Sequence, residues 1–291
     1  MKKNSFGTIL RIVYSNSLKT FKKSSSIFIP FIIFALFEFA TLAVIYFIPR
    51  NPLRPILGPP ISTFWGEKFL HFPTNFTLYP KLLWISKMGL TIFLGSLLTG
   101  MAVCLVINIY NKKKISLGAA FRVALKKYIS LFIVVLIFTI LFYALNKVLF
   151  INLVKYFKAG HNSLLFMEPD LWLGPILIVL NFMLAILVQS AFVYTIPILI
   201  NETANPAKAI LRSIILFFKS FFPTIFLVGI PMLIYIPKVI LDLNSASLMY
   251  RFFPEVVIGF SVLGIVLSTL IMDPIITVCA TVLYLKKREE E

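Results

Sequence analysis

Six long apolar stretches run through this chain of 291 residues and constrain its fold more than any other feature. A helix needs about 20 apolar residues to cross the hydrocarbon core of a bilayer, and each stretch reaches that length. Hydrophobic residues make up 59% of the chain and charged residues only 13%, which is more apolar surface than a soluble core of this size can bury. The sequence therefore predicts an all-α, polytopic membrane helical bundle, a single integral membrane domain over residues 1–291. The six predicted transmembrane helices cover residues 28–48, 83–109, 129–149, 173–200, 222–241 and 256–285.

The net charge of +17 is divided unevenly between the two sides of this bundle. Residues 1–23, 110–128, 201–219 and 286–288 together hold 18 Lys and Arg residues, against eight in the connections on the other side. Basic residues close to span ends are retained in the cytoplasm. We therefore expect a multi-pass protein of the bacterial plasma (inner) membrane with both termini cytoplasmic. Because the charge lies beside membrane segments, it does not indicate a nucleic-acid partner.

Three of the basic segments resemble one another when Arg11, Arg122 and Arg212 are superposed. Around each arginine the apolar residues recur at helical spacing, which predicts an amphipathic helix lying in the membrane interface. Each such helix precedes a span out, an outer loop and a span back. The pattern predicts a threefold internal repeat with units at about 1–109, 110–200 and 201–291. The alternative is that any basic amphipathic linker would look the same.

The repeated basic helices favour membrane lipids, in particular anionic ones, as partners. A cation near an anionic leaflet contributes about 1 kcal/mol to binding. The leading hypothesis is a non-enzymatic protein that binds or organises lipid or a membrane protein partner through these helices. The residues predicted to face anionic lipid are Arg11, Lys112, Lys113, Lys114, Arg122 and Arg212.

Three short motifs also resemble a known family. They are the exit of the fourth span at residues 194–202, the segment 207–214 that follows it, and the segment 115–121 in the middle cytoplasmic connection. With its six spans, the chain is similar to bacterial six-helix membrane proteins related to the membrane domain that precedes glycerophosphodiester phosphodiesterases, and to their free-standing relatives of unknown role. The resemblance implies this architecture. It does not carry over the phosphodiesterase activity, because spans and short loops use the whole length of the chain.

Two carboxylates fall near the middle of predicted spans. Glu38 lies in the first span and Asp273, which precedes a proline, lies at a similar depth in the sixth. An ionised carboxylate in hydrocarbon is costly and is therefore a candidate functional group. The functional hypothesis is an ion or proton site in a transporter or permease subunit. The alternative is that both acids are structural and bond to nearby hydroxyls or to Asn181 and Gln189.

Three further predictions concern other polar residues and prolines. Lys87 and Lys238 are expected to extend from outer span ends to the interface. Prolines 223, 231 and 237 predict a bent or broken fifth span. Glu202 precedes an interfacial helix and is expected to cap it or to pair with Arg122 or Arg212.

The motifs of enzyme chemistry are absent from the sequence. We find no phosphate-binding glycine loop, no zinc-binding histidine pair and no serine elbow between glycines. The two histidines, His71 and His161, fall in separate loops, and Cys104 and Cys279 lie within apolar runs as small apolar residues. We therefore predict no catalytic residue, no metal site and no cofactor.

Overall fold

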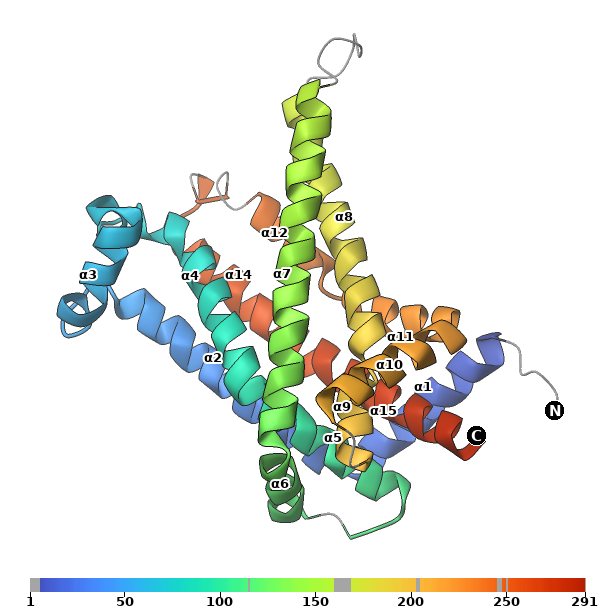
Figure 1. Cartoon of the computed structure of the whole chain (residues 1–291). Helices are drawn as coiled ribbons and strands as arrows, with labels where there is room; N and C mark the ends of the chain where they lie inside the picture. Colours follow the sequence, from blue (N-terminus) through green and yellow to red (C-terminus); the bar gives the residue numbers. More distant parts are fainter. Residues whose placement is uncertain are drawn as a thin grey trace.

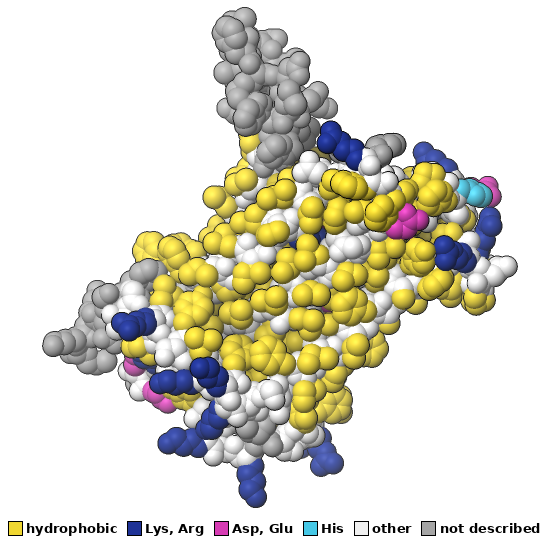
Figure 2. All heavy atoms as spheres, turned by 180° about the vertical axis from the view of Figure 1, so that it is seen from behind, with side chains coloured by type: hydrophobic (Ala, Val, Ile, Leu, Met, Phe, Trp, Pro, Cys, Tyr) yellow, Lys and Arg dark blue, Asp and Glu magenta, His cyan; other side chains and the backbone are white. Residues whose placement is uncertain are grey.

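The described part of the chain folds into helices joined by short connections (Figure 1). The computed structural model describes residues 6–114, 116–159, 169–202, 205–244, 248–249 and 251–290. Within these ranges all regular secondary structure is helical, which confirms the all-α prediction. Figure 2 shows hydrophobic side chains covering the middle of one face, with Lys and Arg gathered toward its ends. This is the surface expected of a protein whose belt faces lipid.

Five uninterrupted or gently bent helical segments are long and apolar enough to cross a membrane. In chain order, the five segments consist of the following helices: η1 (Ser25–Phe28) with α2 (Ile29–Phe47); α4 (Asn75–Leu90), η3 (Thr91–Gly95) and α5 (Ser96–Tyr110); α7 (Tyr128–Ala159); α8 (Pro169–Phe192) with α9 (Thr195–Asn201); and α14 (Val256–Ile265), η5 (Val266–Met272) and α15 (Asp273–Glu290). These segments correspond to five of the six predicted spans. The structure therefore supports a multi-pass membrane protein with five such helices, or six if one bent pair counts as a span.

The fifth predicted span, 222–241, is not a continuous helix. It divides into α11 (Phe221–Leu233) and α12 (Ile236–Leu243), as the prolines predicted. Pro231 lies inside α11 and Pro237 in the first turn of α12, and neither can donate a helical hydrogen bond. The 13 residues of α11 extend only about 20 Å, less than the hydrocarbon thickness. This helix also meets α10 (Pro206–Lys219) at a bend of 99°.

The three segments predicted to be amphipathic form helices that precede apolar helices in the chain: α1 (Phe6–Lys23), α6 (Leu117–Lys126) and α10. Ser116 begins α6, and its hydroxyl accepts a hydrogen bond from the Ala119 amide at 3.3 Å. Pro206 begins α10 in the first turn, where its missing N–H costs nothing. All three helices bury one face against the bundle, so the prediction of helices in these segments is confirmed.

The centre of the bundle is formed by α5, α9 and α15, which pack against one another. Small and β-branched side chains allow this close approach, among them Ala102, Val103 and Ala280, all almost fully buried. Each amphipathic helix packs on a different member of this trio: α6 on α5, α10 on α9, and α1 on α15. Cys104 and Cys279 are free and buried in the same core, as expected for small apolar residues.

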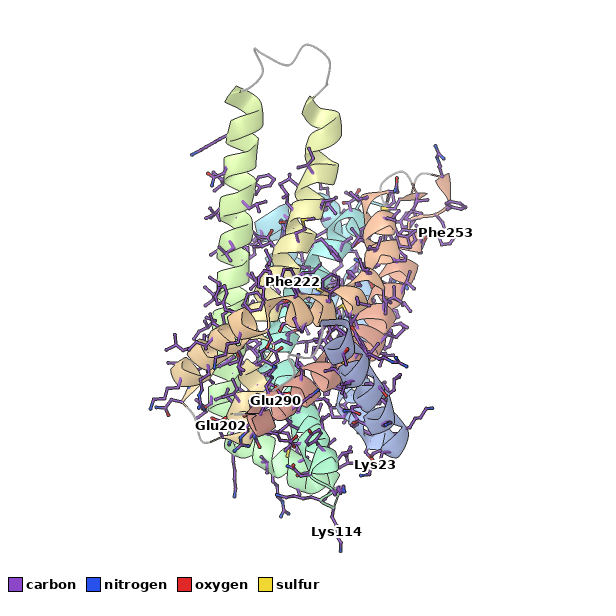
Figure 3. All side chains as sticks on the ribbon, turned by 90° about the vertical axis from the view of Figure 1, so that its right-hand side faces the viewer. Lys23, Lys114, Glu202, Phe222, Phe253 and Glu290 are labelled. Atoms are coloured by element: carbon purple, nitrogen blue, oxygen red, sulfur yellow. The ribbon has the colours of Figure 1, made fainter. Side chains whose placement is uncertain are left out.

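The two ends of the bundle differ in character. Lys23, Lys114, Glu202 and Glu290 lie at one end and Phe253 at the other (Figure 3). At the second end, the connection between α2 and α4 contains α3 (Arg54–Trp65) and η2 (Glu67–Leu70). Phe64 and Phe72 are exposed there, as expected for aromatic side chains at a membrane interface.

Gly100 lies where α5 packs closely against α7, and this contact yields a first prediction. A Cβ atom at this position would lie 2.6 Å from Cδ1 of Leu131, a side chain that is itself fully buried. Gly100→Ala should therefore destabilise the bundle by about 1–3 kcal/mol and lower the melting temperature.

Gly89→Ala is the matched control, because its new Cβ would have no neighbour within 4 Å. It should be neutral or stabilising by about 0.4–1 kcal/mol, since it only reduces the freedom of the unfolded chain. Thermal unfolding of the two purified variants in detergent distinguishes them. Equal melting temperatures would show that α5 and α7 are not packed as described.

Candidate functional site

Glu38 is at the centre of a polar cluster buried between three helices. Its side chain, on α2, is 1% exposed. Nζ of Lys87, on α4, lies 2.8 Å from Glu38 Oε1, and the Thr269 hydroxyl, on η5, donates to Oε2 at 2.5 Å. The cluster thus joins the first, second and last apolar helices by an ion pair and a hydrogen bond inside the apolar bundle.

Lys87 also donates a hydrogen bond to the Ser268 hydroxyl at 2.9 Å. The prediction that Lys87 extends to the outer interface is therefore wrong: its ammonium turns inward to the carboxylate. An inward cation is favoured because an isolated carboxylate at this depth would be costly, whereas a paired and hydrogen-bonded one is tolerated. A sequence signal existed, since the second predicted span contains a single cation and the first a single acid.

The local backbone of η5 explains why two hydroxyls reach this cluster. Residues Val266–Met272 form a π-helix, whose wider turn is uncommon and often occurs at functional positions. Ser268 and Thr269 are both buried there, and the Ser268 hydroxyl also donates to the Gly264 carbonyl at 2.7 Å. Polar groups within hydrocarbon are thus satisfied by helix carbonyls and by each other.

Lys238 lies near the same cluster, on α12. It forms an ion pair with Asp242, one turn further along this helix. Lys238, Asp242, Glu38 and Lys87 together line a groove of about 90 Å³ between α2, α4, α12 and α14. Two cations and two anions line this groove, so their charges balance.

Asp273 does not share the Glu38 groove. It is the first residue of α15, four residues after Thr269, and it lines a separate cavity of about 210 Å³. Lys87 and Glu38 are near enough for their charges to act on Asp273. However, the described part of the structure shows no hydrogen bond between the two acids. The hypothesis of one site that contains both carboxylates is therefore replaced by two neighbouring sites on either side of η5.

The two amides predicted as partners of these acids occupy different places. Gln189, on α8, lines the same cavity as Asp273. Oδ1 of Asn181, on the same helix, is buried and has no hydrogen-bond partner among the described residues. Glu38 does bond to a nearby hydroxyl, that of Thr269, as the alternative hypothesis stated.

A second polar cluster lies at the end of the bundle that holds Lys114 and Glu290 (Figure 3). Glu202 accepts a hydrogen bond from the Tyr284 hydroxyl at 2.8 Å and forms an ion pair with Arg212. The predicted pairing of Glu202 is thus confirmed, with Arg212 as the partner. The cluster ties α9, α10 and α15 together where they emerge from the core.

Lys127 completes the end of α9. Its ammonium donates to the carbonyls of Leu199 at 2.5 Å, Ile200 at 3.2 Å and Glu202 at 2.8 Å. A helix leaves its last carbonyls without intrahelical donors, and a cation there also offsets the helix dipole. Burial lowers the pKa of the Lys127 ammonium below its usual value of 10.5. Elsewhere at this end, burial raises the pKa of the Tyr14 hydroxyl, on α1, to about 12. The sequence offered no signal that a lysine between α6 and α7 caps the helix that ends the fourth predicted span.

The six residues predicted to face anionic lipid lie on exposed surface. Arg11, Arg122 and Arg212 lie on α1, α6 and α10, and Lys112, Lys113 and Lys114 lie between α5 and α6. Among the described residues, no three His, Cys, Asp or Glu side chains are grouped so that they could hold a metal ion. His161 lies outside the described residues.

Comparison with known proteins adds no relative. No protein-family model, no curated protein and no solved structure matches the chain.

The Glu38–Lys87 pair yields a second prediction. Lys87→Met leaves the buried Glu38 carboxylate without its partner and should cost about 3–5 kcal/mol of stability, whereas Glu38→Gln leaves a Lys87 side chain that is 35% exposed and should cost less. The double substitution removes both charges and should recover most of that loss. A double-mutant cycle of unfolding free energies measures the coupling.

Lys238→Met serves as the control for this cycle. The Lys238–Asp242 pair lies within one helix and its carboxylate is 43% exposed, so its loss should cost about 1 kcal/mol or less. Strictly additive effects of Glu38→Gln and Lys87→Met would contradict a direct pair.

Proposed function

We propose that this chain is a non-enzymatic protein of the bacterial plasma membrane that binds and organises anionic lipid at the cytoplasmic leaflet through α1, α6 and α10. The observation that carries the proposal is the arrangement of side chains around these helices. Each buries one face against the core and leaves exposed a basic stripe, and α6 and α10 also leave exposed an apolar stripe. A helix anchored to its own protein in this way presents both stripes to the membrane interface.

The arrangement is clearest on α10. Ala209, Ser213 and Phe217 face the bundle, while Leu211, Ile215 and Phe218 are exposed. At about 100° per residue, the three bases of this helix fall in one narrow stripe along the edge of the exposed apolar surface. Those bases are Lys208, Arg212 and Lys219. Apolar side chains can therefore enter the acyl boundary while the cations remain at the level of the phosphates.

Helix α6 repeats this arrangement in fewer residues. Ala120 and Ala124 are fully buried, Phe121 and Leu125 are exposed, and Arg122 and Lys126 follow them around the helix. The rotational order of buried, apolar and basic surfaces is the same as on α10. This shared order supports a common role for the two helices.

The burial pattern also supports the threefold repeat. Along residues 11–20 of α1, the order of buried, half-buried and exposed side chains recurs along 211–220 at every position except 12 and 212. In addition, α1, α6 and α10 each pack on a different member of the central trio. We infer three related units, each formed by an amphipathic helix and two apolar segments, arranged around α5, α9 and α15.

The proposed orientation places the end with Lys23 and Lys114 in the cytoplasm. It rests on the excess of Lys and Arg in the connections at that end. The proposed relationship to the membrane domain of glycerophosphodiester phosphodiesterases rests on the motifs at 115–121, 194–202 and 207–214. In the structure, Glu202 and Arg212 from two of these motifs form an ion pair. This contact gives a structural reason for both residues to be present.

The third prediction tests lipid binding directly. The triple variant Arg122→Gln/Lys126→Gln/Lys208→Gln removes three exposed cations from α6 and α10. At about 1 kcal/mol for each cation, affinity for anionic lipid should fall on the order of a hundredfold. The measurement titrates anionic phospholipid into protein held in neutral nanodiscs and follows the rise in melting temperature.

A matched triple variant at the other end, Arg54→Gln/Lys68→Gln/Lys147→Gln, should keep the affinity of the unaltered protein. The proposal fails if the unaltered protein gains no stability from anionic over neutral lipid. It also fails if the two triple variants lose affinity equally.

A second candidate function, a transporter or permease subunit, is favoured by the Glu38–Lys87–Thr269 cluster inside the bundle. Ionisable groups at this depth commonly mark ion or proton pathways. As a fourth prediction, Glu38→Gln/Asp273→Asn should lower proton flux into proteoliposomes at least tenfold, whereas Asp242→Asn should not. An entrapped pH-sensitive dye reports the flux, and a rate for the unaltered protein equal to that of empty liposomes would exclude this function.

A further inference from the structure

The cavity that contains Asp273 is partly open and lies between η3, α5, α7, α8, α9 and α15. Its volume is about 210 Å³. An apolar protein cavity of about 150 Å³ holds benzene, so this one can hold a molecule of somewhat greater size. The neighbouring groove beside Glu38 is less than half as large, at about 90 Å³. The Asp273 cavity is therefore of a size suited to a small organic ligand.

The wall of this cavity has two distinct parts. One part is apolar and comes mainly from α7 and the end of α8, with Val134, Val135, Phe138 and Phe192. The other part is polar and contains Asp273, Gln189, Thr99 and Thr277. Ligand sites in proteins typically combine an apolar surface with a few convergent polar groups that fix orientation.

Asp273, which is half-buried, differs from the fully buried Glu38 in what compensates it. Glu38 has an ion pair and a hydroxyl donor. For Asp273 the described residues provide neither a hydrogen bond nor an ion pair, although its carboxylate is a lining group of the cavity. A carboxylate enclosed by hydrocarbon and protein requires a cation or a strong donor. The cavity is the place where such a group can approach it.

The chemistry of the wall limits what that group can be. A divalent metal ion would need several oxygen ligands at 2.0–2.6 Å, and this cavity offers one carboxylate in a space far larger than an ion. A protonated amine needs one counter-ion and hydrogen-bond acceptors, which Asp273, Gln189 and the hydroxyls supply. Its carbon body would contact Val134, Val135 and Phe138.

We propose that the cavity between η3, α5, α7, α8, α9 and α15 binds a small amphipathic primary amine, with the ammonium against Asp273 and the apolar body against α7. This site is distinct from the lipid-binding helices, and it can be occupied whether or not the chain moves anything across the membrane. Its failure in the test below would leave the lipid proposal untouched, since none of the variants alters a basic residue of α6 or α10.

The fifth prediction uses two probes of equal size, 2-phenylethylammonium and neutral 2-phenylethanol. Full-length protein in neutral nanodiscs is titrated with each, and saturable binding is followed by ligand-observed NMR. The unaltered protein should bind the ammonium at least tenfold more tightly than the alcohol, because only the ammonium gains the charge pair with Asp273. Asp273→Asn should bring the two affinities to the same value.

Two further variants complete the experiment. Val135→Phe fills part of the cavity and should weaken both probes at least tenfold while Asp273 is still present. Asp242→Asn removes an acid outside the cavity and should leave both affinities unchanged. Equal affinity of the unaltered protein for both probes, a charge preference that survives in Asp273→Asn, or binding unaffected by Val135→Phe would each overturn the proposal.

Discussion

The requirement that polar groups inside a bilayer find partners within the protein determines much of this structure. Hydrocarbon offers no hydrogen bonds, so a buried carboxylate must be paired or must meet a ligand. Glu38 meets this requirement with Lys87 and Thr269, which connect α2 to α4 and η5. Helices near the two ends of the chain, α2 and η5, are thereby joined inside the bundle, in addition to the packing of α1 on α15. Satisfying one acid thus also fixes the relative placement of distant segments.

The sequence was sufficient to predict the apolar helices and the shorter helices that precede them, because both depend on periodicity and length. It also predicted the break in the fifth stretch, since proline acts locally. It did not predict the partner of Glu38. Lys87 lies far from Glu38 along the chain, and only the packing of α2 against α4 brings them together. Side-chain partners across helices depend on tertiary contacts, which one sequence does not encode in any local pattern.

The proposed threefold repeat shows how an alignment of arginines can differ from an alignment of buried residues. Superposing the arginines aligns Val13 with Ala124, both buried, two positions after Arg11 and Arg122. In the third segment the buried residue is Ser213, only one position after Arg212. The burial pattern therefore aligns Arg11 with Leu211, and the arginine of the third unit is displaced by one residue. This displacement turns Arg212 toward Glu202, with which it pairs. The third unit thus departs from the pattern at the residue that forms the ion pair.

The π-helix η5 separates two sites of opposite character. On one side, Thr269 helps to satisfy Glu38 in a groove where two cations and two anions balance. On the other, Asp273 begins α15 and faces a larger cavity whose other polar groups are neutral. Residues 269 and 273 are four positions apart, which is close to one helical turn. Their side chains nevertheless reach different spaces, because Thr269 bonds to Glu38 and Asp273 lines the cavity beside α7 and α8. Positional depth alone, the basis for grouping Glu38 with Asp273, therefore assigns them to a common site that the folded chain divides.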